Sequence, residues 1–199
     1  MYTIGIDEVG RGSLAGPVVV AAVLLPRGWR PRRILKDSKR MTPAAREMWF
    51  EYLKSSGISY STARVYPKGI DRLNISNAAN LAATRAFQKL IDCSFAGLET
   101  SEYCVVLDGG LYLSSNVPIL KMRTVIKGDE KFNCIKLASI MAKVTRDRYM
   151  VKLHEAYPDY GFKKHKGYGT EYHIKAVKKY GYSDVHRRSF KVKGAQSII

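Results

Sequence analysis

The chain has 199 residues, of which 46% are hydrophobic and 26% charged; this composition suits a globular domain and excludes an intrinsically disordered chain. It carries 34 Lys and Arg against 17 Asp and Glu, a formal net charge of +17. So large an excess repels itself in a compact fold and therefore favours a polyanionic partner, nucleic acid above all. A basic surface that serves only solubility is the alternative.

The cysteines and the lengths of the apolar runs indicate the cellular compartment in which the protein is expected. The chain has three cysteines, an odd number, and no C-x-x-C pair occurs among Cys93, Cys104 and Cys134. This pattern predicts reduced core thiols rather than a disulfide framework or a zinc site. The N-terminus carries acids instead of a basic-then-apolar leader, and no apolar run approaches the roughly 18–20 residues of a membrane span. We therefore expect a cytoplasmic protein with no membrane partner.

Strands and helices alternate in the hydrophobic pattern. Strands are expected over residues 2–6, 17–25, 58–65, 103–107 and 119–126, and helices over 43–54, 77–91 and 132–154. Thr42 is expected to cap the first helix, with Pro43 at its first position. This order predicts an α/β fold with a central five-stranded mixed sheet flanked by helices, its first strands antiparallel and its later ones parallel.

The composition changes near residue 158. Residues 161–199 hold ten Lys and Arg but only Glu171 and Asp184, and aromatic residues are interleaved with the basic ones. We expect residues 158–199 to form a helical C-terminal element that grips a phosphate backbone. It would belong to the same domain as residues 1–157, which would carry the catalytic site.

Four carboxylates lie at or just past the ends of predicted strands: Asp7, Glu8, Asp108 and Asp129. Strand ends are where sites gather in α/β proteins. Four converging acids would repel one another without cations, and Mg²⁺ or Mn²⁺ prefers carboxylate oxygen and water. Two such ions can support in-line displacement at a phosphodiester. An acidic centre in a basic protein therefore predicts a metal-dependent nuclease.

Other acids are interpreted as structural. Asp147 lies between Arg146 and Arg148 in a predicted helix and is expected to form an ion pair. Helix caps or surface charges are the interpretation for Asp37, Asp71, Asp92 and Asp159.

Gly10, Arg11 and Gly12 directly follow the first acidic pair. Two glycines allow a close backbone approach or positive φ, although many tight turns contain such a pair. Backbone amides and carbonyls can read a 2′-hydroxyl, which both donates and accepts. This turn is therefore a candidate for contact with a sugar and its phosphate.

The run GIDEVGRGSLAGPVVVAAV, residues 5–23, resembles the opening of the type 2 ribonucleases H, the ribonuclease HII family. The resemblance continues in order through DSK (37–39), LDG (107–109), KGD (127–129), ASIMAKVTRD (138–147), KGYGT (166–170) and HRRSF (186–190). It therefore spans the chain to about residue 190. Since the first strand opens the sequence, the type 3 enzymes, which have an extra N-terminal domain, are not expected.

The resemblance implies a ribonuclease H-like fold and an endonuclease. The enzyme would hydrolyse the RNA strand of RNA–DNA hybrids and cut 5′ of ribonucleotides embedded in duplex DNA. Catalysis by two metal ions, Mg²⁺ or Mn²⁺, would leave 3′-hydroxyl and 5′-phosphate ends. The four acids would bind the metals, with the share of each left open.

The same resemblance implies roles in substrate binding. Gly10, Arg11 and Gly12 would recognise the ribonucleotide at an RNA–DNA junction, and Tyr168 would pack on the sugar of the next nucleotide. The residues implied to contact phosphates are Ser38, Lys39 and Lys143. His173 and His186 occupy matched positions, where a structural role is expected.

Two rival functions are weighed. A junction-resolving nuclease of the same fold would share the acids and the charge, but would not require the GRG and GYG elements. A non-catalytic hybrid-binding module would leave the four acids unexplained. A monomer is expected. The tail Gln196–Ile199 weakly resembles a sliding-clamp-binding peptide, but it ends before any aromatic pair.

Overall fold

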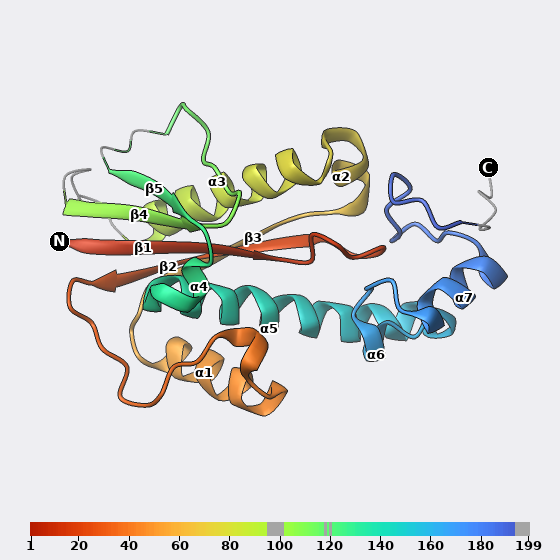
Figure 1. Cartoon of the computed structure of the whole chain (residues 1–199), viewed down its shortest axis with the longest axis horizontal. Helices are drawn as coiled ribbons and strands as arrows, with labels where there is room; N and C mark the ends of the chain where they lie inside the picture. The colour runs from red at the N-terminus through yellow and green to blue at the C-terminus, as the bar shows by residue number, and fades with distance from the viewer. Residues whose placement is uncertain (95–101, 118, 120, 194–199) are drawn as a thin grey trace.

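A single mixed sheet organises the computed structural model, which describes residues 1–94, 102–117, 119 and 121–193 (Figure 1). Its strands, in the order β3-β2-β1-β4-β5, are β1 (Tyr2–Val9), β2 (Val18–Pro26), β3 (Tyr60–Val65), β4 (Tyr103–Asp108) and β5 (Met122–Val125). β1–β2 and β2–β3 are antiparallel, whereas β1–β4 and β4–β5 are parallel. The predicted five-stranded mixed α/β sheet is confirmed.

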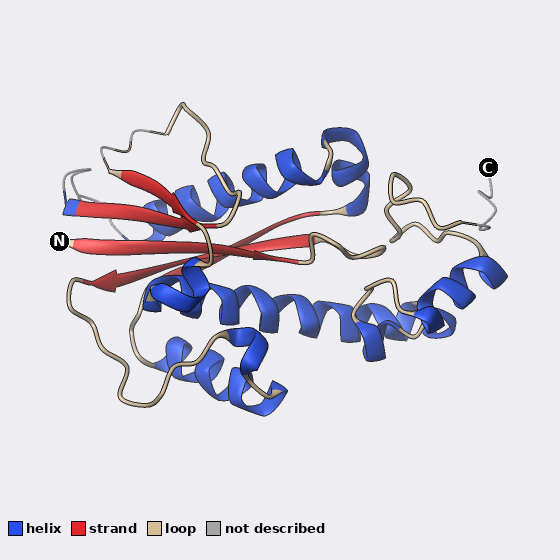
Figure 2. Ribbon diagram, in the orientation of Figure 1, coloured by secondary structure: helices blue, strands red, loops and turns tan. Residues whose placement is uncertain are grey.

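Helices cover both faces of the sheet (Figure 2). α2 (Pro67–Leu73) and α3 (Ile75–Ser94) lie on one face; α1 (Pro43–Ser55) and α5 (Asn133–Ala156) lie on the other. The face that α3 turns to the sheet consists largely of fully buried alanines: Ala78, Ala79, Ala82, Ala83 and Ala86. Small side chains let this helix pack closely, while β2 is buried on both faces as its continuous apolar run predicts.

Gly5 sets the distance between β1 and α5. A Cβ at this position would meet backbone atoms of Cys134 and the amide nitrogen of Ile135, the latter at 2.5 Å. No side chain can be accommodated against backbone at that separation. The glycine thus brings the start of α5 directly against β1, the strand that carries the first two acids.

The C-terminal element is helical, as predicted. α6 (Phe162–His165) and α7 (Glu171–Tyr180) pack at the far end of α5, and the segment after α7 returns to the loop that follows β1 (Figure 1). A small core joins them, formed by Ala15, Met150, Tyr160, Phe162, Ala176 and Val177. The division of the chain at residue 158 stays a prediction.

Several predicted boundaries differ from the structure. β1 continues to Val9 because the long strand β2 keeps pairing with it, Glu8 opposite Val20 and Val9 opposite Val19. Two short helices were not predicted, α2 and α4 (Gly128–Lys131). Each has too few residues to establish a helical period. The Thr42 cap is confirmed, since its hydroxyl accepts from the Ala45 amide at 3.2 Å.

The three cysteines are free thiols, in line with the expectation of no disulfide. Cys134 is buried and Cys104 is half-buried, but Cys93 is exposed, so the expectation of a core position was wrong for Cys93. It lies in the last turn of α3, where the helix face turns to solvent. Among the described residues, no helix is both long and apolar enough to cross a membrane.

Candidate active site

Neighbouring strands and one short helix position the four acids. Asp7 and Glu8 lie inside β1, not beyond its end as predicted, and Asp108 is the last residue of the adjacent strand β4. Asp129 lies on α4, not in the loop expected just beyond β5. Successive side chains of a strand point to opposite faces, so Asp7 faces α5 while Glu8 faces the α3 side.

Asp7 is almost completely buried. Burial raises the pKa of its carboxyl well above the usual range, and the nearby acids Glu8 and Asp108 raise it further. A hydrogen bond from Ser139 on α5 opposes this rise. The Ser139 hydroxyl is itself 2.7 Å from the hydroxyl of Ser38, so the two serines form a polar link to the buried acid.

The carboxylate of Glu8 has a cation next to one oxygen and no hydrogen-bond partner at the other within the described part of the chain. Burial raises the pKa of Glu8, and Arg11 opposes the rise with an Nη1–Oε1 distance of 3.4 Å. Its Oε2 is buried and has no hydrogen-bond partner among the described residues. A buried carboxylate oxygen without a partner is costly, so this atom is a candidate ligand for a cation.

Asp108 and Asp129 adjoin through the start of α4. The Gly128 amide donates to Oδ1 of Asp108 at 2.6 Å, and burial raises the pKa of Asp108, with the charge of Asp129 contributing. The ammonium of Lys39 lies 2.8 Å from Oδ2 of Asp129, and this bond raises the pKa of Lys39. Lys39 is therefore the cation that neutralises Asp129 in this structure.

The donor set fits a hard divalent ion in its chemistry. Three of the four carboxyls have raised pKa values because burial and mutual repulsion disfavour their charges, and a divalent cation relieves both effects. Within the described part of the chain, however, no three Asp, Glu, His or Cys side chains already converge as a metal-holding group. In this structure Asp129 is engaged with Lys39.

One cavity of about 500 Å³ contains every predicted site residue except Asp129. It is lined by Asp7, Glu8, Gly10, Arg11, Gly12, Ser38, Lys39, Asp108, Lys143 and Tyr168, together with Val9, Arg46 and Ser139. Acids from two strands thus share a space with the GRG turn and with Tyr168 of the C-terminal element.

Two buried arginines fix the GRG turn. Arg187 donates to the Gly10 carbonyl at 2.7 Å and to the Arg11 carbonyl at 2.8 Å. Gly10 has φ of +89°, and a Cβ there would collide with the side chain of Arg146. Arg146 in turn donates to the Pro17 carbonyl at 2.9 Å. The carbonyls of Gly10 and Arg11 therefore face the guanidinium of Arg187, while the Arg146 side chain packs against Gly10.

Tyr168 lies beside two basic side chains of α5. The ammonium of Lys143 is 5.9 Å from its ring centroid, and the guanidinium carbon of Arg146 is 5.4 Å away. Lys143 also pairs with Asp147 at 2.8 Å. The expected ion pair of Asp147 therefore exists, but the lysine one turn earlier is its partner, because the flanking arginines point elsewhere around the helix.

Sequence reasoning gave no role to several residues around the cavity: Ser139, Arg46, Arg146 and Arg187. The spacing of Ser139, Lys143 and Asp147 at i, i+4 and i+8 places them on one helix face and could have revealed the serine. Asp71 is more than a surface charge or cap, since its carboxylate accepts from the Arg188 and Ser189 amides, both at 2.9 Å. It holds the C-terminal segment to α2.

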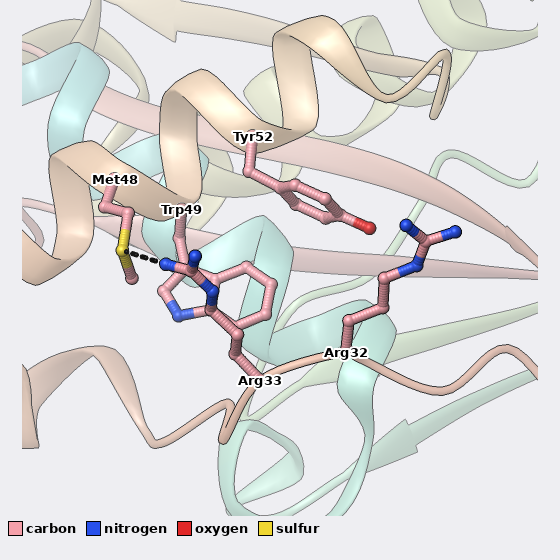
Figure 3. Close-up of a pocket in the computed structure, with 5 residues that line it drawn as sticks. All are labelled: Arg32, Arg33, Met48, Trp49 and Tyr52. Atoms are coloured by element: carbon pink, nitrogen blue, oxygen red, sulfur yellow. Dashed lines mark hydrogen bonds between the residues drawn. The ribbon is translucent and has the colours of Figure 1, made fainter.

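A second cavity, of about 370 Å³, has none of the predicted site residues in its lining (Figure 3). It lies between the basic loop after β2 and α1 and is lined by Arg32, Arg33, Met48, Trp49 and Tyr52. Arg33 approaches the Met48 sulfur at 3.1 Å. It holds no acid, so it cannot take part in metal chemistry of the kind expected at the first cavity.

Comparison with known proteins agrees with this fold. The family model described as Ribonuclease HII matches residues 4–193. A ribonuclease HII of Caldicellulosiruptor bescii is 44% identical over 192 residues, which covers 95% of this chain and 86% of the relative. The solved ribonuclease H2 of Pyrococcus horikoshii is 26% identical, with a TM-score of 0.68 and coverage of 96% and 95%.

A further solved structure, the PCNA:RNase HII complex from Archaeoglobus fulgidus, is 23% identical, with a TM-score of 0.73 and 98% coverage of both chains; this likeness shows the fold. The class these comparisons define is that of the metal-dependent ribonucleases, hydrolases that act on phosphodiester bonds. The chain belongs to the ribonuclease HII family.

Proposed function

We propose that this protein hydrolyses the RNA strand of RNA–DNA hybrids and cuts 5′ of ribonucleotides embedded in duplex DNA. The observation that carries the proposal is the shared cavity, in which a backbone turn and an aromatic ring lie next to buried acids. The acids supply the chemistry, while the turn and the ring supply a reason to select a ribonucleotide.

Asp7, Glu8, Asp108 and Asp129 would hold the metal, Mg²⁺ or Mn²⁺. Such ions, when bound, activate water and neutralise charge on a phosphodiester during in-line displacement. The chain's own contribution is to hold buried, mutually repelling carboxyls in place: Ser139 and Arg11 each stabilise the charged form of one. The expected products carry 3′-hydroxyl and 5′-phosphate ends.

Selection of the ribonucleotide would fall to the GRG turn and Tyr168. Gly12 is exposed, and a Cβ at this position would meet nothing within 4 Å, so a sugar can approach its backbone from the cavity. Tyr168 lines the cavity, and the cationic groups of Lys143 and Arg146 already lie over its ring, so the sugar would pack on the part of the ring that the cavity exposes. An added 2′-hydroxyl would disturb that packing, which favours deoxyribose on the 3′ side.

Phosphate contacts are proposed for Lys39 and Lys143, whose ammonium groups are at the cavity. Each already has a carboxylate partner, Asp129 and Asp147 respectively, so each would share or exchange it for a phosphate. Ser38 is buried and bonded to Ser139, and this favours support of Asp7 over a direct phosphate contact.

The test uses a labelled DNA duplex with one ribonucleotide, with and without Mg²⁺ or Mn²⁺, and all-DNA and all-RNA duplexes as controls. We expect metal-dependent cleavage just 5′ of the ribonucleotide and intact controls. The Asp7→Asn variant should bind the duplex normally but lose turnover by at least about 10³-fold. Cleavage of the all-DNA duplex would favour a junction-resolving nuclease, and binding without cleavage would favour a non-catalytic module.

Partners beyond the substrate stay predictions. The sliding-clamp proposal concerned Gln196–Ile199, which lie outside the described residues. Its support is indirect: one structural neighbour was solved in complex with PCNA. The monomeric state and the cytoplasmic location also stay predictions.

A further inference from the structure

Three histidines form a cluster next to Tyr168, and two of them are buried. His165 lies on α6, His173 on α7 and His186 in the segment after α7. The His165 and His173 rings stack at 4.4 Å between centroids, and His173 and His186 are at most 2% exposed. Their aromatic neighbour Phe162 excludes water from one side, since its ring is 5.4 Å from that of His173.

Hydrogen bonds connect two of these rings to the Tyr168 backbone. The Ser183 amide donates to Nδ1 of His186 at 3.1 Å, so that nitrogen is an acceptor. Nε2 of His186 lies 3.0 Å from Nε2 of His173, and Nδ1 of His173 lies 2.9 Å from the Tyr168 carbonyl oxygen. The chain of contacts begins and ends on backbone groups that are 15 residues apart in sequence, Ser183 and Tyr168.

Only one arrangement of protons satisfies every contact. Because Nδ1 of His186 accepts, its proton is on Nε2 and is donated to Nε2 of His173. His173 must then carry its own proton on Nδ1, from which it donates to the carbonyl of Tyr168. A second proton on His173 would be on Nε2 and would face the N–H of His186 across 3.0 Å. A second proton on His186 would be on Nδ1 and would face the Ser183 amide N–H across 3.1 Å. Burial lowers the pKa of His173 to about 4 and that of His186 to about 3, in agreement with two neutral rings.

Tyr168 depends on its backbone for its position. Its amide donates to the His165 carbonyl at 3.0 Å, and a bridge pairs Tyr168 with Ser13 next to the GRG turn. The preceding residue, Gly167, accepts from the Leu14 amide at 2.8 Å. A shift of this backbone would therefore move the tyrosine ring relative to the neighbouring GRG turn.

We propose that His173 and His186 are positioning residues for Tyr168: their neutral imidazole pair holds the Tyr168 carbonyl and so fixes the ring next to the GRG turn. Neither histidine touches the substrate. The pair links the C-terminal segment to the reading of the nucleotide 3′ of the cut. This inference rests on the proposed role of Tyr168 in that reading.

The kinetic test compares kcat/KM for a duplex with one embedded ribonucleotide and for a continuous RNA–DNA hybrid. The Tyr168→Ala variant gives the reference ratio of the two kcat/KM values for a protein without the tyrosine ring. His173→Phe and His186→Phe should each move the ratio towards that value by roughly tenfold. His173→Gln, which keeps a hydrogen-bond donor and an acceptor, should keep the ratio closer to that of the unchanged protein. In the double variant with Tyr168→Ala, His173→Phe should have no further effect on the ratio.

The matched control is Val177→Ala, which truncates a buried apolar side chain one turn after His173 on α7 and removes no hydrogen bond of the pair. It should lower Tm by an amount similar to the His variants and leave the substrate ratio unchanged. If the His variants slow both substrates equally, as Val177→Ala would through lost stability, the positioning role is wrong.

A second measurement determines the protonation of His173 and His186 without an activity assay. Long-range ¹H–¹⁵N NMR at pH 7 should show His186 protonated on Nε2 and His173 protonated on Nδ1, both neutral. A charged ring or the opposite tautomers would overturn the inference. If the tautomers are as expected but Tyr168→Ala leaves the substrate ratio unchanged, the proposed role of Tyr168 fails and the positioning role fails with it, whereas the bonded pair itself stands.

Discussion

Gly10 and Gly12 flank Arg11 in one turn, yet the two glycines have different surroundings. Gly10 adopts a positive φ and lies against Arg146, so its lack of a side chain serves the packing of the protein. Gly12 has open space around its Cα, so its lack of a side chain serves whatever enters the cavity. The two substitutions therefore separate stability from binding.

Gly10→Ala should destabilise the protein by roughly 1–3 kcal/mol, because an L side chain is strained at this φ and would displace the buried guanidinium. Gly12→Ala should leave the free energy of unfolding within about 0.5 kcal/mol and weaken binding of ribonucleotide-containing duplex. Urea unfolding and fluorescence anisotropy measure the two effects. Equal losses of stability in both variants would contradict this division.

At the level of elements, α5 and the C-terminal element build one wall of the cavity together. On α5, Ser139 bonds to Asp7 of β1, and one turn later Lys143 lies next to the ring of Tyr168. The C-terminal element brings Tyr168 to that wall and is held by the histidine pair and by Arg187. Its stability should therefore depend on the protonation of its histidines.

Stability should fall as the pH drops below about 6.5, the ordinary pKa of a histidine. His173 and His186 have lowered pKa values because they are buried, so the unfolded chain binds more protons between pH 6.5 and about 4. Over this range, each of the two histidines lowers the free energy of unfolding by at most about 1.4 kcal/mol for each pH unit of acidification. The titratable rings packed on them are those of His165, Tyr160 and Tyr182.

Thermal unfolding from pH 7 to pH 5 checks this sign. The double variant His173→Phe/His186→Phe should show a flatter dependence of Tm on pH. The acids Asp7, Glu8 and Asp108 act in the opposite direction, because their raised pKa values let the folded chain take up protons first on acidification. Equal pH dependence in the variant and the unchanged protein would show that the pair does not set it.

The whole molecule combines a buried acidic centre with a net charge of +17. Such a field attracts a polyanion over many ångströms, and the acids then meet the phosphodiester only at short range. Lys39 stands at the boundary between these two effects, because it is largely exposed and yet pairs with the buried Asp129. The charge distribution thus makes association dependent on salt.

Binding of a hybrid to the Asp7→Asn protein should weaken steeply with salt, and Lys39→Ala should reduce the slope of log K against log[salt] by about 0.9, the loss of one phosphate contact. Lys54→Ala is the matched control: this exposed lysine pairs with Glu51 on α1 and does not line the cavity, so the slope should not change. An unchanged slope for Lys39→Ala would remove it from the phosphate contacts.

Much of the fold and the site was predictable from local patterns. The continuous apolar run before Pro26 predicts a strand buried on both faces, and Thr42-Pro43 predicts where α1 begins, because these signals depend on neighbours in sequence. The resemblance, carried by motifs in order, indicated which residues share the cavity. Their chemical roles stay predictions.

By itself the sequence determined the long helices, the strands of the mixed sheet and the acids as candidates, because hydrophobic period and residue chemistry are local properties. Only the tertiary structure decided that β1 continues through Asp7 and Glu8, because β2 pairs with them, and that Lys39 neutralises Asp129 across 90 positions of sequence. The histidine pair is likewise invisible locally. Burial, hydrogen-bond partners and tautomers depend on which distant segments fold together, and no spacing along the chain encodes them.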